Sequence, residues 1–174
     1  EAAWGEVSKT LNGGWGCPDL RYSRSAVPAT LDMESYRITA WRGERASAQV
    51  LLWSAEGAAG VECEIAPFKG DAGSLPASIA EARFVRYTIA DEQNYNFKKG
   101  GPAVLMPDML DSLSTFDMAA RTTRPVWLTV TVPASAQPGL YKSSITIKHN
   151  GWGKVTLPLV LEVVAPFAMH DSGP

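Results

Sequence analysis

The sequence predicts an all-β fold, a two-layer antiparallel β-sandwich of the immunoglobulin-like or jelly-roll-like type. Apolar and polar residues alternate with a period of two in several segments, which is typical of half-buried strands. Turn-forming pairs such as Pro138-Gly139 and Asn150-Gly151 separate these segments, and helical periodicity is almost absent. Seven or eight strands are expected, but their order in the sheets does not follow from the sequence.

The last third of the chain carries the strongest strand pattern. A strand is predicted over 124–133, with its core-facing residues at Val126, Leu128, Val130 and Val132. Pro133 has no amide hydrogen to donate and is expected to end that strand. Two further strands follow, one on each side of the Asn150-Gly151 turn, so the three should form an antiparallel set.

Earlier segments predict four more strands, over 36–41, 45–54, 61–66 and 84–89. The strand over 45–54 is apolar on both faces after Gln49, so we expect it to be central or covered on both sides. Residues 1–28 read as loops with one strand at most. The stretch over 91–121 has no clean period and is too long for an ordinary connection, which suggests a functional loop or a contact with a neighbour, with one helical turn over 108–113.

The length of 174 residues suits a single domain, with its core over about 30–165 and a linker over 166–174. The net charge of −2, without a basic block, argues against nucleic-acid binding. No apolar run is long enough to span a membrane, and Glu1 is expected to begin a mature or trimmed chain. Of the two cysteines, Cys63 should face the core as a small apolar residue, which is favoured over a disulfide to Cys17.

No catalytic, metal or cofactor site is predicted. His149 and His170 are expected at the surface, and no nucleophile motif accompanies them. Asp108, Asp111 and Asp117 could bind calcium, but their spacing fits a solvated acidic loop better. Glycoside cleavage needs two facing carboxylates, and the sequence cannot show that any two candidates face each other. These candidates are Glu44, Glu62, Glu64, Asp91, Glu92 and Asp108.

The tryptophans are the most suggestive side chains. Trp41, Trp53 and Trp127 fall opposite the core residues of their strands, and Trp152 follows a turn. An outer face with several indoles should not stay in water, so the long loop, another domain or stacked sugar rings would cover it. Cover by protein is favoured, and all four indoles are candidates for interdomain or glycan contact.

Three segments together resemble a known family. They are 41–45 with Ala48-Gln49 after it, then 107–111, then 125–133 followed by Pro138-Gly139-Leu140-Tyr141. Their order and spacing resemble the N-terminal β-sandwich domain that precedes the catalytic barrel in glycoside hydrolase family 123. The resemblance extends over about residues 36–165.

Relatives of this kind are β-N-acetylgalactosaminidases. Their catalytic Asp-Glu pair lies on a following (β/α)₈ barrel, and the substrate's own acetamido group is the nucleophile. The resemblance therefore implies that no catalytic residue lies here, and that this is a noncatalytic domain packing against a C-terminal catalytic barrel beyond Val164. It also implies a bacterial protein exported to the periplasm or cell surface. In the 41–45 segment, Gly43 should permit a tight turn, and Glu44 and Arg45 either tie that turn to backbone or face solvent. The alternative is a carbohydrate-binding module that uses the surface tryptophans.

Overall fold

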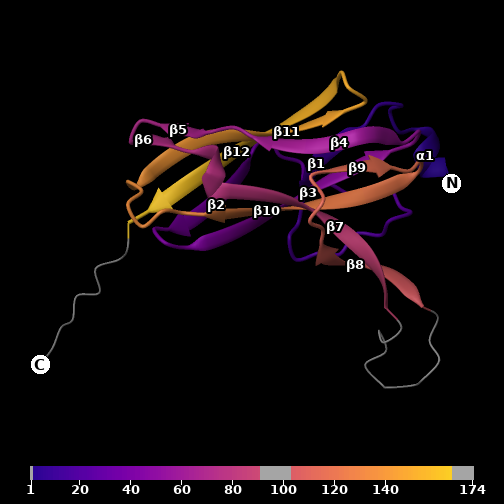
Figure 1. Cartoon of the computed structure of the whole chain (residues 1–174), viewed down its shortest axis with the longest axis horizontal. Coiled ribbons are helices and arrows are strands. Elements are labelled where there is room, and N and C mark those ends of the chain that lie inside the picture. The colour runs from indigo at the N-terminus through magenta and orange to yellow at the C-terminus, as the bar shows by residue number, and fades with distance from the viewer. Residues whose placement is uncertain (1, 91–102, 166–174) are drawn as a thin grey trace, which may run out of the picture.

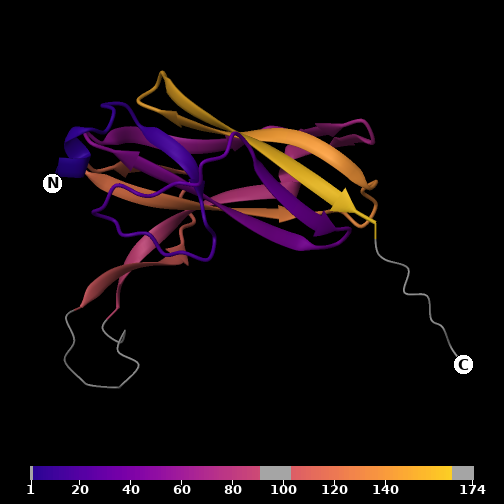
Figure 2. The ribbon, with the colours of Figure 1, turned by 180° about the vertical axis from the view of Figure 1, so that it is seen from behind.

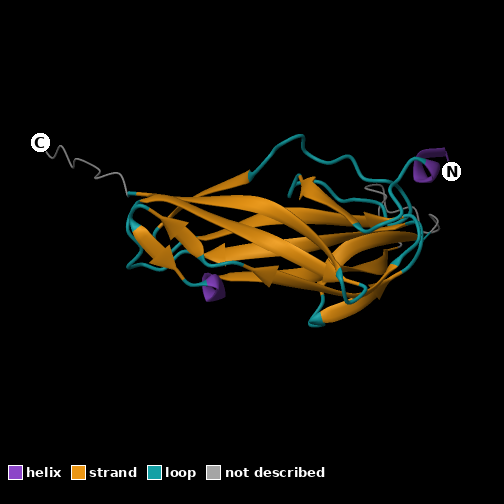
Figure 3. Ribbon diagram, turned by 90° about the horizontal axis from the view of Figure 1, so that it is seen from above, coloured by secondary structure: helices purple, strands orange, loops and turns teal. Residues whose placement is uncertain are grey.

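The computed structural model describes residues 2–90 and 103–165. Strands dominate, and helix is limited to α1 (Ala2–Gly5) and the 3₁₀ turn η1 (Ala77–Ile79) (Figure 3). The strands are β1 (Asn12–Gly16), β2 (Tyr36–Trp41), β3 (Arg45–Ser54), β4 (Ala58–Ile65), β5 (Phe68–Gly70), β6 (Gly73–Leu75), β7 (Ala80–Ala90), β8 (Val104–Leu110), β9 (Thr115–Met118), β10 (Thr122–Thr131), β11 (Gly139–His149) and β12 (Gly153–Val164). None of the helices in the described part of the chain is long and apolar enough to cross a membrane.

These strands form two stacked sheets, which confirms the predicted all-β sandwich (Figure 1). One sheet has the order β1-β3-β10-β7-β8, and the other has the order β2-β12-β11-β4-β9 with the short β5 and β6 beside β11. The pairing is antiparallel except between β2 and β12, which are parallel. This one pair departs from the antiparallel pairing expected for the sandwich. The two strands are distant in sequence, so no hairpin turn forces their directions to be opposed.

The core lies between the two inner faces and follows the predicted alternation. On β10, Val126, Leu128 and Val130 are fully buried. From the opposite sheet, Ile145 on β11 and Leu161 on β12 are equally buried. Burial of a side chain of this size contributes about 1.5–3 kcal/mol, so the paired inner faces supply the main driving force for folding.

Two of the predicted turns form as expected, whereas Gly139 begins β11 and the turn before it lies at Ala134-Ser135. Asn150 and Gly151 have positive φ values of 53° and 72°, and they lie in the turn between β11 and β12, where His149 and Gly153 pair with each other. Gly43, at φ 79°, turns the chain between β2 and β3. The Glu44 carboxylate accepts a hydrogen bond of 2.7 Å from the Trp41 amide, so it ties this turn to backbone, whereas Arg45 faces solvent.

The stretch over 91–121 differs most from expectation. Its described part holds two strands, β8 and β9, and the helical turn predicted over 108–113 is absent, because Val104–Leu110 pairs with β7. Residues 91–102 lie outside the described residues. Figure 2 shows the β7–β8 hairpin leaving the body of the sandwich. With five extra short strands, the described chain has more strands than the seven or eight expected.

The outer face of the five-stranded sheet is covered by residues 17–31, here called the covering segment. Thr123 fixes it by donating from its amide to the Arg24 carbonyl and from its hydroxyl to the Ala26 carbonyl. The Tyr87 hydroxyl donates to the Tyr22 carbonyl, 2.9 Å away. The strand over 45–54 is therefore covered on both sides, as predicted, but by the covering segment and not by the long loop.

Glycines in β1 make this cover possible. A Cβ on Gly14 would lie 2.7 Å from the Thr30 methyl carbon, and one on Gly16 would lie 2.8 Å from Leu51 Cγ. Both contacts are too close for any side chain, so the glycine-rich sequence of β1 allows Leu51 to be fully buried on the outer face.

Cys63 points inward and packs against the core, as predicted, and both thiols are free. Burial raises the pKa of the Cys63 thiol to about 12, and the nearby Glu62 carboxylate adds to the effect. The thiol is therefore neutral and unreactive at physiological pH.

Candidate functional site

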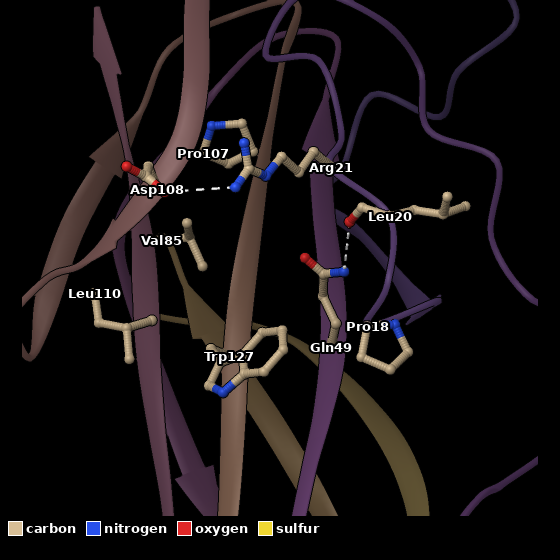
Figure 4. A pocket seen from close by; sticks show the side chains of 9 residues that line it. All are labelled: Pro18, Leu20, Arg21, Gln49, Val85, Pro107, Asp108, Leu110 and Trp127. Atoms are coloured by element: carbon tan, nitrogen blue, oxygen red, sulfur yellow. Dashed lines mark hydrogen bonds and ion pairs between the residues drawn. The ribbon is translucent and has the colours of Figure 1, made fainter. Parts of the chain in front are cut away.

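A groove of about 250 Å³ lies on the outer face of the five-stranded sheet, between the covering segment and β8 (Figure 4). Its lining residues come from the covering segment and from β3, β7, β8 and β10. They are Pro18, Leu20, Arg21, Gln49, Val85, Pro107, Asp108, Leu110 and Trp127.

A β-bulge shapes one wall of this groove. Pro107 pairs with Tyr87 and Met109 pairs with Arg86, so Asp108 is an extra residue without a partner on β7. Its carboxylate lies 3.8 Å from the Arg21 guanidinium on the opposite wall. The two side chains are largely exposed, so this ion pair bridges the groove without closing it firmly.

The floor combines an indole with an amide. Trp127 follows the outward alternation of β10 and is half-buried, as its position in the strand predicted. Gln49 donates from Nε2 to the carbonyls of Cys17, at 2.7 Å, and Leu20, at 3.2 Å. In Figure 4 its oxygen points toward the middle of the groove. An indole, an amide oxygen and one ion pair are suited to binding a polar ring. Among the described residues, Asp108 is the only carboxylate in the lining, whereas glycoside cleavage needs two.

The four candidate tryptophans do not form one platform. Trp53 and Trp127 are half-buried on the outer face of the five-stranded sheet. Trp41 is 58% exposed at the end of β2, and Trp152 is 80% exposed in the β11–β12 turn. The length of β12 separates these two indoles, roughly 35 Å at the usual rise per residue.

A second polar cluster forms where the sheets meet beyond the core. The buried Asp111 carboxylate accepts hydrogen bonds from Arg86 Nε, at 3.0 Å, and Nη2, at 3.1 Å, and it lies 3.5 Å from Arg124 Nη2. Arg124 also stacks over the Phe116 ring, 4.9 Å from its centroid. Burial alone would raise the pKa of Asp111, but the Arg86 and Leu113 hydrogen bonds and the guanidinium charges together hold it below its usual value.

This cluster was missed in the sequence, because Arg86 and Arg124 are far from Asp111 along the chain. With two arginines on one carboxylate and aromatic rings beside it, the cluster joins β7 and β10 to the segment that follows β8. We interpret it as a structural ion pair rather than a reactive centre.

Two further candidate carboxylates, Asp117 and Glu64, have partners of their own. Asp117 accepts a hydrogen bond of 2.8 Å from the Gly60 amide, and Glu64 pairs with Lys148. The three aspartates considered for calcium therefore do not converge, and across residues 2–90 and 103–165 no group of three metal-ligating side chains occurs. Glu62 is exposed on β4, whereas Asp91 and Glu92 lie outside the described residues.

His149 is buried, so the prediction of a surface histidine is wrong. Only 4% of its surface is exposed, because the turn folds Gly153 against the imidazole ring. Burial lowers the pKa of His149, and its Nδ1 has no hydrogen-bond partner among the described residues. His170 lies outside the described residues.

The fold and groove define a β-sandwich domain with a partly covered outer face. Residues 15–149 match the family model of the glycoside hydrolase 123 N-terminal domain. The chain therefore belongs to this family, as its resemblance predicted.

Solved structures agree with this assignment at the level of the fold. A structure from work on glycolipid glycan hydrolysis by a family 123 glycoside hydrolase from Clostridium perfringens aligns with a TM-score of 0.78 at 18% identity. The alignment covers 90% of this chain but 27% of that chain, so this chain spans about a quarter of its relative. The sporulation control protein Spo0M from Bacillus subtilis aligns with a TM-score of 0.42 at 8% identity, over 90% of this chain and 49% of that one, which is too weak to argue from. No curated protein sequence matches.

Proposed function

We propose that this chain is the noncatalytic accessory domain of an exported bacterial glycoside hydrolase, and that it packs against a catalytic barrel that follows it. The observation that carries the proposal is the family match combined with the share of the relative that the chain spans. The domain supplies a rigid support, and the chemistry belongs to the remaining part of the parent protein.

The side chains described above support a noncatalytic role. Within the described part of the chain, the groove is lined by a single carboxylate, Asp108, whose partner is Arg21. The buried carboxylate Asp111 is held ionised by two arginines, whereas a general acid needs a raised pKa.

The test compares chain 1–174 with the natural polypeptide that continues past Pro174. Both are assayed on aryl N-acetylgalactosaminides and on glycolipid glycans. We expect turnover by the longer polypeptide and none by chain 1–174. Turnover by chain 1–174 that is lost in Asp108→Asn would contradict the proposal.

Export is tested in the organism that produces the parent polypeptide. Cell fractionation followed by immunodetection should place the parent polypeptide in the periplasm or at the cell surface. Exclusive recovery from the cytoplasm would contradict this part of the proposal.

A second candidate function, a carbohydrate-binding module, is favoured by the groove over Trp127 and Gln49. Indole faces stack on sugar rings, and the amide oxygen could accept a hydrogen bond from a hydroxyl. A glycan titration should then quench the tryptophan fluorescence of the wild-type chain and of Trp152→Phe, and have a much smaller effect on Trp127→Phe. No change with any glycan of a broad panel would exclude this alternative.

A further inference from the structure

We infer that one end of the seven-stranded sheet, around Trp41, is the surface on which the following catalytic domain docks. This inference rests on the proposed function and adds the location of the contact. The surface consists of Trp41, Leu140 and Val164, and is called the exit patch below.

The exit patch lies where the described chain leaves the sandwich. Trp41 is the last residue of β2 and pairs with Val164, the last residue of β12. The indole is 58% exposed although the backbone of Trp41 is paired within the sheet. A large aromatic surface left in water beside the point of exit is typical of a surface that a neighbouring domain covers.

The three side chains share the outer face. In β2, Ile38 and Ala40 are buried, so Arg37, Thr39 and Trp41 point outward. Leu140 pairs with Glu162, which is two residues before Val164 on the same face of β12, and Leu140 is 50% exposed. Diagonal neighbours of this kind are within reach of one another, so the patch is continuous.

The Glu162 carboxylate, which lies beside the exit patch on the same face, already has hydrogen-bond and ion-pair partners. The Glu162 carboxylate accepts hydrogen bonds from Arg37 Nε, at 3.0 Å, and from the Thr39 hydroxyl, at 2.9 Å. Arg37 Nη2 lies 2.8 Å from its second oxygen. Covering this edge would bury a satisfied ion pair and not a lone carboxylate, which lowers the desolvation cost of docking.

The backbone around Trp41 is also fixed in advance. The Trp41 amide donates to the Glu44 carboxylate, while Gly43 and Glu44 exchange backbone hydrogen bonds of 2.9 Å with Val132. The backbone of Trp41 therefore loses little freedom when the indole is covered, and this pre-organisation favours binding.

The occupant follows from the length of the relative. This chain spans 27% of the family 123 structure, so a large domain is expected beyond Val164, and its first residues must start at the exit patch. The other apolar surface, on the β7–β8 hairpin, includes Ile89, Leu105 and Met109. Figure 1 shows that this hairpin leaves the opposite end of the sandwich from the end of β12.

Hydroxyl-radical footprinting with mass spectrometry tests the inference, because indoles and thioethers are oxidised in proportion to their exposure. Oxidation rates are compared between chain 1–174 and the natural polypeptide that continues past Pro174. Trp41 should be oxidised several-fold more slowly in the longer polypeptide. Trp152, which is 80% exposed at the other end of β12, is the internal control and should keep its rate.

Four other outcomes would overturn the inference. Protection of Met109 with an unchanged Trp41 would place the contact on the β7–β8 hairpin. Protection of Trp41 in chain 1–174 by added glycans would make the patch a sugar site. If the longer polypeptide is enzymatically active but its Trp41 is oxidised at the same rate as in chain 1–174, the docking surface is wrong and the proposed function stands. A coding sequence that stops at Pro174 would overturn both.

A variant pair gives an independent measurement. In the longer polypeptide, Trp41→Ala should speed proteolytic cleavage between the two domains, and Trp152→Ala should not. Both variants of chain 1–174 should unfold at nearly the wild-type urea concentration, since each indole is exposed there. Equal cleavage of the two longer variants would contradict the inference.

Discussion

The outer faces of the two sheets differ in how they meet their surroundings: one is covered by a loop, and the other is exposed to solvent. The five-stranded sheet is apolar on its outer face and lies under the covering segment, where Leu51 is fully buried and Gln49 and Thr123 bond to the backbone above them. The seven-stranded sheet is open and carries charged and hydroxyl pairs such as Glu64–Lys148 and Thr146–Thr156.

The difference shows which side chains a sheet needs when a loop without regular secondary structure covers its outer face. A loop has carbonyl groups with no ladder partner, and a face that receives it must supply donors as well as apolar surface. Gln49 and Thr123 are those donors. An open face needs only solubility, which exposed pairs provide at little energetic gain.

Leucines on the two outer faces should give the largest contrast. Leu51→Ala removes a fully buried side chain beneath the covering segment, and we expect it to lower the free energy of unfolding by about 2–5 kcal/mol. Leu140→Ala, on the open face, should change it by about 0.5 kcal/mol or less. Urea titration followed by tryptophan fluorescence measures both. Similar losses in the two variants would show that the cover adds no real burial.

Removing the amide of Gln49 tests the donors directly. Gln49→Leu leaves the Cys17 and Leu20 carbonyls without this donor, and the expected loss is about 1–3 kcal/mol. Limited proteolysis should then cut within residues 17–31 before the rest of the chain. Thr146→Val, which removes a hydroxyl pair from the open face, serves as the control and should leave the cleavage pattern unchanged. Wild-type cleavage of Gln49→Leu would show that the covering segment is held by apolar contact alone.

Ion pairs allow a third contrast between a buried and an exposed carboxylate. Asp111→Asn should lower the urea midpoint clearly, because Arg86 and Arg124 would keep their charges beside a neutral amide, whereas Glu162→Gln on the open face should have a smaller effect. The pKa of Asp111 is lowered by folding, so its contribution is present above the unfolded pKa and is lost as pH falls through the lower folded value. The wild-type chain should therefore lose more stability than Asp111→Asn between pH 5 and acid. Parallel losses would show that the cluster does not act as an ion pair.

The smallest effect on the free energy of unfolding is expected from the Cys63 thiol, and it appears only at alkaline pH. Its pKa is raised to about 12 in the folded chain, against an ordinary value near 9. Above pH 9 the unfolded chain loses this proton first, so stability falls as pH rises, at a rate of at most about 1.4 kcal/mol per pH unit. Cys63→Ala should have a flatter dependence over this range, measured by urea titration at several pH values. Superimposable slopes would contradict burial of the thiol.

The alternating strands could be predicted because their two faces meet different surroundings. Val126, Leu128 and Val130 face the core, while Trp127 and Thr129 face outward. This difference is visible in the sequence as a two-residue alternation. The strand β8 has mostly exposed side chains on both faces, so Val104–Leu110 carries no alternation to detect. The sequence predicted a loop with one helical turn over 108–113, but pairing with β7 overrides this local preference.

The candidate site was predictable only in part, for a related reason. The outward position of Trp127 follows from its strand, but the walls of the groove come from Arg21 and Asp108, which no periodicity connects. The covering segment has no repeat at all, so its place over Gln49 depends on long-range contacts. The burial of His149 depends in the same way on how closely the turn brings Gly153 to the ring.

The bulge in β8 has a consequence for the chain in solution. Among the strands that the structure describes, β8 is the outermost of its sheet and has no partner on its far edge, and such an edge can pair with other polypeptides and aggregate. Pro107 lacks an amide hydrogen, and the bulge at Asp108 breaks the regular spacing of donors and acceptors beside it. Pro107 and the bulge at Asp108 thus also hinder edge-to-edge pairing of β8 with another polypeptide.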